Sequence, residues 1–182
     1  MINLYHLSAG DRVPDIVNVV IEIPAGTRNK VEYDPVYGVF RVDRVLHTPM
    51  HYPGDYGFIP GTLSPDGDPL DALVLVTEAT FTGCVLSSRP IGILEMIDED
   101  RRDQKILAVP EADPRFDEVV SLDGLGHHLL REVEFFFSVY KELEGKKTVA
   151  QGWHQVEAAR AAIVDAARAF AEKHGRDGEA VR

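Results

Sequence analysis

Apolar and polar residues alternate along the chain from Ile16 to Ile23. Val17, Val19, Ile21 and Ile23 fall on one face of an extended segment, while Asn18 and Glu22 fall on the other. A period of two over this length predicts a half-buried strand. Pro24 ends the strand, because proline has no amide hydrogen to donate to a neighbour.

Similar short strands are predicted across the first two thirds of the chain. KVEYD and VFRVDRVL flank the turn-rich sequence DPVYG, which is typical of a hairpin whose turn uses Pro35 and Gly38. The segment HYPGDYGFIPG is predicted to be a rigid loop, since Pro53 and Gly54 separate its two tyrosines. Further strands are predicted at Ala72–Val76, Pro90–Ile97 and Lys105–Val109.

The period becomes helical after Asp123. One apolar stripe is formed by Leu129, Val133, Phe136, Phe137 and Tyr140. Gly145 is expected to end this helix, and an alanine-rich second helix is predicted from about His154 to Lys173, followed by a frayed tail. Short strands followed by two helices predict an α+β, mainly-β fold, with the helices packed outside a small closed antiparallel barrel.

Composition fits a single domain and narrows the possible partners. The chain has 182 residues, 45% of them apolar, and no repeat or linker divides residues 1–182. Its net charge of −11 disfavours binding to nucleic acid or to an anionic membrane. The lone Cys84 cannot build a disulfide framework, and no stretch approaches the roughly 20 apolar residues of a membrane helix. With no signal-peptide pattern at the first residues, a cytoplasmic location is expected.

The sequence SPDGDPLDALVLV places three carboxylates at the start of a predicted buried strand. Asp66, Asp68 and Asp71 lie on a bend that Gly67 and Pro69 keep out of a helix. Three ionised groups this close raise one another's pKa unless a cation neutralises them. The segment is either a solvated acidic turn or a cation site. It does not match an EF-hand, and oxygen ligands favour Mg²⁺ or Mn²⁺.

A second acidic stretch, MIDEDRRDQK, also follows a predicted strand. It spaces Asp98 and Asp103 around a turn, which alone could be a polar hairpin loop. If both acidic loops meet at one barrel mouth, they could hold several metal ions close together, as a two-metal phosphoryl-transfer site requires.

An anionic substrate at such a site would need positive or neutral hydrogen-bond donors. Candidates near predicted strand or helix ends are Lys30, Arg44, Lys105, Lys141, Tyr52, Tyr56 and Tyr140. Each has an ordinary alternative, a surface charge for the cations and rim packing for the tyrosines. Other site types lack support: there is no P-loop, dinucleotide turn or nucleophile elbow. His47 and His51 cannot form a helical zinc pair with Pro49 between them.

Taken in order, these motifs resemble the soluble family I inorganic pyrophosphatases of the bacterial type. The resemblance rests on VVIEIPAGTRNKVEYD, FRVDRVL, YPGDYGFIPGTL, DGDPLD, RPIGILEMIDE, DRRDQKILAVP and FFFSVYKELEG, and it covers roughly residues 15 to 155. It implies a five-stranded, OB-like barrel with two flanking C-terminal helices. It also implies Mg²⁺-dependent hydrolysis of pyrophosphate to two orthophosphates by in-line attack of a metal-bridged hydroxide. Several Mg²⁺ ions per site, Mn²⁺ or Zn²⁺ as possible substitutes, and a homohexamer are further implications.

The resemblance implies a role for each matched residue. Asp68 takes the position of the general base. The implied metal ligands are Asp66, Asp71, Asp98, Asp103 and Glu32. The residues implied to bind or line the substrate are Lys30, Arg44, Tyr56, Lys105, Tyr140 and Lys141, with Glu22 and Tyr52 in supporting positions. Residues 1–13 and 174–182 carry no matched motif and are expected to form a peripheral extension and a tail.

Three features depart from the family pattern beside the matched positions, namely Val31, the stretch VAQGW at the tryptophan, and the pair Arg101 and Arg102. They bear on rate or metal preference more than on the type of reaction. Two other functions are compatible with such a barrel. A catalytically inactive relative would normally have lost ligands, and none is missing here. A nucleic-acid-binding OB-like module would need a basic groove with exposed aromatics, which the net charge of −11 disfavours.

Overall fold

The structure, a computed structural model, describes residues 3–179, with side chains described as far as His174. The strands of this part are β1 (Val17–Ile23), β2 (Asn29–Asp34), β3 (Val39–Val45), β4 (Asp55–Ile59), β5 (Leu70–Val74), β6 (Val85–Asp98), β7 (Arg101–Pro110) and β8 (Thr148–Gln155). The α-helices are α1 (His127–Val139) and α2 (Val156–Glu179). Short 3-10 helices are η1 (Leu4–His6), η2 (Pro114–Phe116), η3 (Leu122–Gly124) and η4 (Glu142–Glu144).

Five strands close into a ring in the order β1-β4-β5-β7-β6, because β1 also pairs with β6. This confirms the predicted five-stranded, OB-like barrel with two C-terminal helices. One pairing differs from the antiparallel prediction, since β5 and β7 run parallel. The reason is that β6 comes between them along the chain and crosses over to pair with β1 on its other side.

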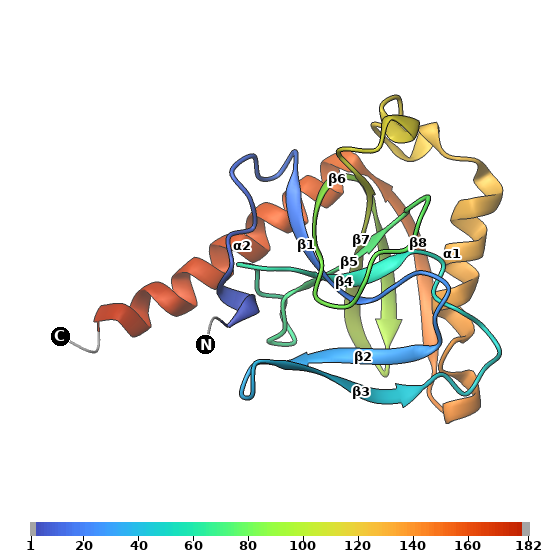
Figure 1. The fold of residues 1–182 in the computed structure, drawn as a ribbon, viewed down its shortest axis with the longest axis horizontal. Coiled ribbons are helices and arrows are strands. Elements are labelled where there is room, and N and C mark those ends of the chain that lie inside the picture. The colour runs from blue at the N-terminus through green and yellow to red at the C-terminus, as the bar shows by residue number, and fades with distance from the viewer. Residues whose placement is uncertain (1–2, 180–182) are drawn as a thin grey trace.

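The barrel buries apolar residues on both faces of its strands, and one helix covers each of two sides. Val133, Phe136 and Phe137 of α1 join one apolar cluster. Ala159 and Ile163 of α2 join another. Figure 1 shows α1 and α2 on different sides of the barrel, with the β2–β3 hairpin set apart below it. Burial on both faces explains why β5 is continuously apolar from Ala72 to Val74.

Two strands were not predicted. β4 lies in the segment expected to be a rigid loop, because its glycines are typical of loops. A side chain at Gly57 would place its Cβ 1.9 Å from the Val20 carbonyl oxygen, so the close approach of β1 and β4 requires glycine. β8 was also missed, and it includes His154, which was expected to begin the second helix. β8 pairs with β6 outside the ring, and Gly152 has a φ of +120°.

The helices follow the predicted stripes, but their ends differ from the prediction. α1 ends at Val139 and not at Gly145, which instead ends the separate 3-10 helix η4 with a φ of +73°. α2 begins at Val156 and continues to Glu179, past the expected end at Lys173. Residues 180–182 of the expected tail lie outside the described residues. Among the residues described, no helix is both long and apolar enough to span a bilayer.

Candidate active site

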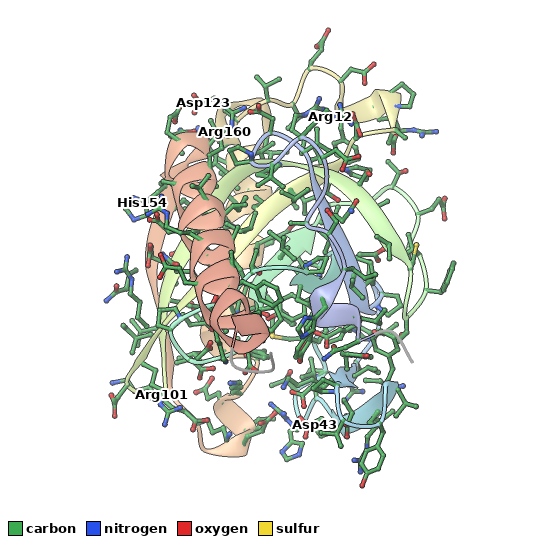
Figure 2. The ribbon with its side chains drawn as sticks, turned by 90° about the vertical axis from the view of Figure 1, so that its left-hand side faces the viewer. Arg12, Asp43, Arg101, Asp123, His154 and Arg160 are labelled. Carbon is green, nitrogen blue, oxygen red and sulfur yellow. The ribbon has the colours of Figure 1, made fainter. Side chains whose placement is uncertain are left out.

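A cavity of about 440 Å³ opens between the β2–β3 hairpin and one end of the barrel. Figure 2 shows Asp43 of β3 and Arg101 of β7 at this same end of the molecule. Residues of both acidic stretches line the cavity, together with cations from β2, β7 and the end of α1. The predicted site residues that line it are Glu22, Lys30, Glu32, Tyr56, Asp66, Asp68, Asp71, Asp98, Asp103, Lys105, Tyr140 and Lys141.

The first acidic stretch forms a tight bend before β5. The Ser64 amide donates to the Asp68 carbonyl oxygen at 2.7 Å, and Gly67 has a φ of +99°. The Asp68 amide in turn donates to Asp66 Oδ1 at 3.2 Å. Asp71 lies beyond the bend, within β5, where it pairs with Phe58 of β4. The bend therefore presents Asp66 and Asp68 from an exposed loop, whereas the sheet fixes Asp71.

Lys105 links the two acidic stretches. The parallel pairing of β5 and β7 sets it opposite Asp71. Its Nζ lies 2.8 Å from Asp71 Oδ2, 2.9 Å from Asp103 Oδ2 and 3.1 Å from the Tyr56 hydroxyl. Lys105 is only 4% exposed, and this burial disfavours its charged form. The facing Asp71 carboxylate nevertheless raises the pKa of Lys105 well above the ordinary value.

Several acidic groups of the cavity have pKa values raised above the ordinary range. Burial raises the pKa of Glu22 to about 8, although its carboxylate accepts a hydrogen bond from the Tyr33 amide at 2.7 Å. Burial also raises the pKa of Asp71, against the opposing effect of Lys105. The pKa of Asp68 is raised by burial and then by the charges of Asp66 and Asp71. Carboxylates that repel one another in this way favour a cation among them.

The remaining cations each contact at least one carboxylate. Lys30 bonds Glu32 and lies 3.6 Å from Asp43. Lys141 bonds Asp98, whose other oxygen, Oδ1, is buried without a hydrogen-bond partner. Such an unpaired buried oxygen is unusual in a folded protein and is typical of a site that takes a ligand.

Two predicted residues do not line the cavity. Arg44 pairs across the hairpin with Lys30, and its Nε donates to Glu144 Oε1 at 2.9 Å, but its Nη2 is buried without a partner. Tyr52 is 2% exposed and packs behind the wall, with its ring centroid 5.4 Å from that of Tyr56 and 4.9 Å from that of Phe136.

The three departures from the family pattern take different positions. Val31 packs against the apolar cluster beneath the hairpin, and VAQGW lies in β8. Arg102 bonds both carboxylate oxygens of Glu95 at 3.0 Å, and both Arg101 and Arg102 line a smaller hollow at the rim beside Asp98 and Lys141.

Among the lining residues that sequence reasoning did not assign to the site is Tyr5. Tyr5 lies in the N-terminal segment, which carries no motif, and it reaches the cavity wall beside Glu22 and Asp68. Only its aromatic character distinguished it in the sequence.

The comparisons with known proteins all point to the same family. The family model described as inorganic pyrophosphatase matches residues 19–171. The chain belongs to the inorganic pyrophosphatase family. A protein of Halalkalibacterium halodurans named inorganic pyrophosphatase is 51% identical over 152 residues, which are 84% of this chain and 93% of that protein. One from Nostoc sp. is 48% identical over 157 residues, 86% of this chain and 93% of the other.

The solved structures of the family agree with the fold. The crystal structure of inorganic pyrophosphatase from Thermus thermophilus superposes with a TM-score of 0.91 at 41% identity, covering 93% of this chain and 99% of the other. Membership of the pyrophosphatase family implies a requirement for a divalent metal ion.

The residues present fit such an ion by their chemistry. The cavity offers carboxylate oxygens and no thiolate or imidazole, and hard divalent cations prefer oxygen ligands. The unpaired Oδ1 of Asp98 is one ready acceptor. Between residues 3 and 179, no three potential ligand groups converge on one point, and the Lys105 ammonium lies between Asp71 and Asp103.

Proposed function

We propose that this chain hydrolyses inorganic pyrophosphate to two orthophosphates in a reaction that requires Mg²⁺. The observation that carries the proposal is the gathering of two acidic stretches and several cations in one cavity of a pyrophosphatase-family fold. Relatives about half identical over most of the chain bear the name inorganic pyrophosphatase. An inactive relative or an OB-like binding module is not favoured, because the matched carboxylates are all present and the cavity is acidic.

Asp66, Asp71, Asp98, Asp103 and Glu32 are the proposed metal ligands. The first four reach the cavity from the two acidic stretches, and Glu32 reaches it from the facing hairpin. Bound divalent cations would lower the pKa of water toward neutrality and offset the charge of the phosphates. Mn²⁺ and Zn²⁺ are proposed as substitutes for Mg²⁺.

Asp68 is the proposed general base. It lies on the exposed bend, its carboxylate has no hydrogen-bond partner among the described residues, and its pKa is raised by partial desolvation at the cavity and by neighbouring acids. A carboxylate that is not held by a protein donor is free to accept a proton from the attacking water.

The proposed substrate ligands surround the carboxylates. Lys30 and Lys141 would hold phosphate oxygens from opposite walls of the cavity, and Arg44 would do so with its unpaired Nη2. Lys105, Tyr56 and Tyr140 would donate from the floor. Because these groups are positioned before the substrate arrives, they can stabilise charge that develops on the leaving phosphate. Tyr52 and Glu22 would act in support, the first by packing and the second by its bond to the hairpin.

We further propose that residues 1–182 form a single domain, which assembles as a homohexamer in the cytoplasm. Neither nucleic acid nor membrane is proposed as a partner, in line with the net charge of −11.

The test is release of phosphate from pyrophosphate by the purified chain, assayed with Mg²⁺, Mn²⁺, Zn²⁺ and Ca²⁺ in turn. The oligomer is sized by light scattering in the same buffers. We expect turnover that depends on the metal and is highest with Mg²⁺. A folded sample that releases no phosphate with any of these ions would refute the proposal.

A further inference from the structure

The N-terminal segment before β1 forms part of the cavity wall. The Tyr5 carbonyl oxygen accepts a hydrogen bond from the Gly61 amide at 2.8 Å, which ties η1 to the end of β4. The Leu4 amide donates to the Tyr33 hydroxyl at 3.1 Å, which ties it to β2. Its position is therefore fixed by two strands that border the cavity.

The opposite side of this segment rests on α2. The ring of His6 lies 5.2 Å from that of Phe170 and 4.6 Å from that of His174. Figure 1 shows η1 between the C-terminal half of α2 and the hairpin. Contacts on both sides therefore hold the segment in place.

Packing fixes the ring of Tyr5, but its hydroxyl has no hydrogen-bond partner among the described residues. The ring packs edge-on against Phe58, with centroids 5.0 Å apart, and against Tyr33 at 5.4 Å. Tyr5 lines the cavity beside Glu22 and Asp68. In the part of the chain that the structure describes, no group hydrogen-bonds its hydroxyl. Burial, followed by the charge of Glu22, raises its pKa, so the phenol keeps its proton and remains a donor.

Glu22 and Asp68 are two candidate acceptors that line the same cavity as this donor. Glu22 already accepts the Tyr33 amide. The Asp68 carboxylate has no such donor among residues 3–179. The Tyr5 hydroxyl, which lacks an acceptor, thus shares the cavity with the Asp68 carboxylate, which lacks a donor among the described residues. The two are not in direct contact, and a water molecule can join groups separated in this way at little cost.

We propose that Tyr5 is a positioning residue that acts through Asp68: its hydroxyl donates, by way of a bridging water molecule, to the Asp68 carboxylate and fixes its orientation. This role rests on the proposed function, in which Asp68 is the general base. It also gives the unmatched N-terminal segment a part in the reaction.

The test uses Tyr5→Phe, which keeps the ring and removes only the hydroxyl. It is compared in the wild-type chain and in an Asp68→Asn background, with Tyr37→Phe as the matched control because Tyr37 is 65% exposed at the hairpin turn. Pyrophosphate hydrolysis is measured at saturating Mg²⁺, together with the thermal midpoint of unfolding. We expect Tyr5→Phe to lower kcat about tenfold, or about 1.4 kcal/mol. KM should stay within about twofold and the midpoint within about 2 °C, because the packing is retained.

In the Asp68→Asn background, adding Tyr5→Phe should change kcat by less than about twofold, since the group it positions is gone. An equal fall in both backgrounds would show a merely structural effect and overturn the proposal. So would a Tyr5→Phe variant that matches the wild type. A wild-type chain that releases no phosphate would overturn the proposed function itself, and this is seen before any variant is compared.

Discussion

The carboxylates of the cavity are held in two different ways. In the strand-borne cluster, which comprises Asp71, Asp103 and Lys105, a buried ammonium bonds both acids at 2.8 and 2.9 Å. In the acidic bend, residues 64–69, Asp68 is exposed, and the loop is defined by backbone hydrogen bonds and by the bond from the Asp68 amide to Asp66 Oδ1. The cluster holds a cation of its own, whereas no cation of the described residues contacts a carboxylate of the bend. The two regions should therefore respond differently to substitution.

Asp68→Asn should separate the two regions most clearly. Loss of the proposed general base is expected to lower kcat about 10²- to 10³-fold. Stability should change by less than about 0.5 kcal/mol, because the side chain is exposed and unpaired. Phosphate release and urea unfolding measure the two effects. Asp117→Asn, at another exposed aspartate, is the control and should alter neither. A large loss of stability in Asp68→Asn would remove the contrast between bend and cluster.

Lys105→Met should mainly affect stability, whereas Asp68→Asn mainly affects turnover. It leaves Asp71 and Asp103 without their shared cation, which is expected to cost about 2–3 kcal/mol of stability. The estimate lies toward the low end for a buried pair because the Asp71 side chain is 33% exposed to the cavity. Urea unfolding in EDTA measures the loss, with the exposed Lys147→Met as control.

Added Mg²⁺ should recover part of this loss, since a divalent ion can neutralise the same carboxylates. If Lys105→Met proves as stable as the wild type in EDTA, the cluster does not depend on its ammonium.

Glu22→Gln tests whether Glu22, a buried acid on β1, makes the stability of the protein depend on pH. Burial is the largest cause that raises the pKa of Glu22 from its ordinary value of 4.5 to about 8 in the folded protein. Between these two pH values, folded Glu22 keeps a proton that the unfolded chain releases. Stability therefore falls as pH rises through this window. Asp71 and Glu32 reinforce the shift, while Lys30 and the Tyr33 amide oppose it.

From pH 6 to 7.5 the wild type should lose about 2 kcal/mol more than Glu22→Gln, measured by urea unfolding in EDTA. The exposed Glu118→Gln should behave as the wild type does. Parallel pH curves for wild type and Glu22→Gln would show that Glu22 is ionised in the folded protein.

The acidic bend could be predicted from the sequence because its signal is local. Carboxylates beside Gly67 and Pro69, followed by an apolar run, define a charged turn before a buried strand. The strand-borne cluster could not be derived in the same way. Lys105 meets Asp71 only because β5 and β7 pair in parallel, and strand order is not visible in a period of two.

The missed strand and the missed tyrosine have related causes. Gly54 and Gly57 are typical of loops, yet here they let β4 approach its neighbours: a Cβ at Gly54 would lie 2.6 Å from the Val74 carbonyl oxygen. Tyr5 reaches the cavity through contacts with residues far along the chain, such as Phe58. Both features follow from tertiary packing, which no local pattern records.

Gly67→Ala should give the smallest effect and shows how the bend is held. Gly67 has a φ of +99°, which alanine rarely adopts, but a Cβ there would meet nothing within 4 Å. The cost is therefore one of backbone conformation, about 1 kcal/mol. Because the bend is exposed, it can relax and move Asp66 and Asp68, so kcat should fall about threefold to tenfold. Gly126→Ala is the control, since Gly126 also has open space but a φ of −66°. If Gly67→Ala and Gly126→Ala have the same turnover as the wild type, the left-handed turn does not set the position of the general base.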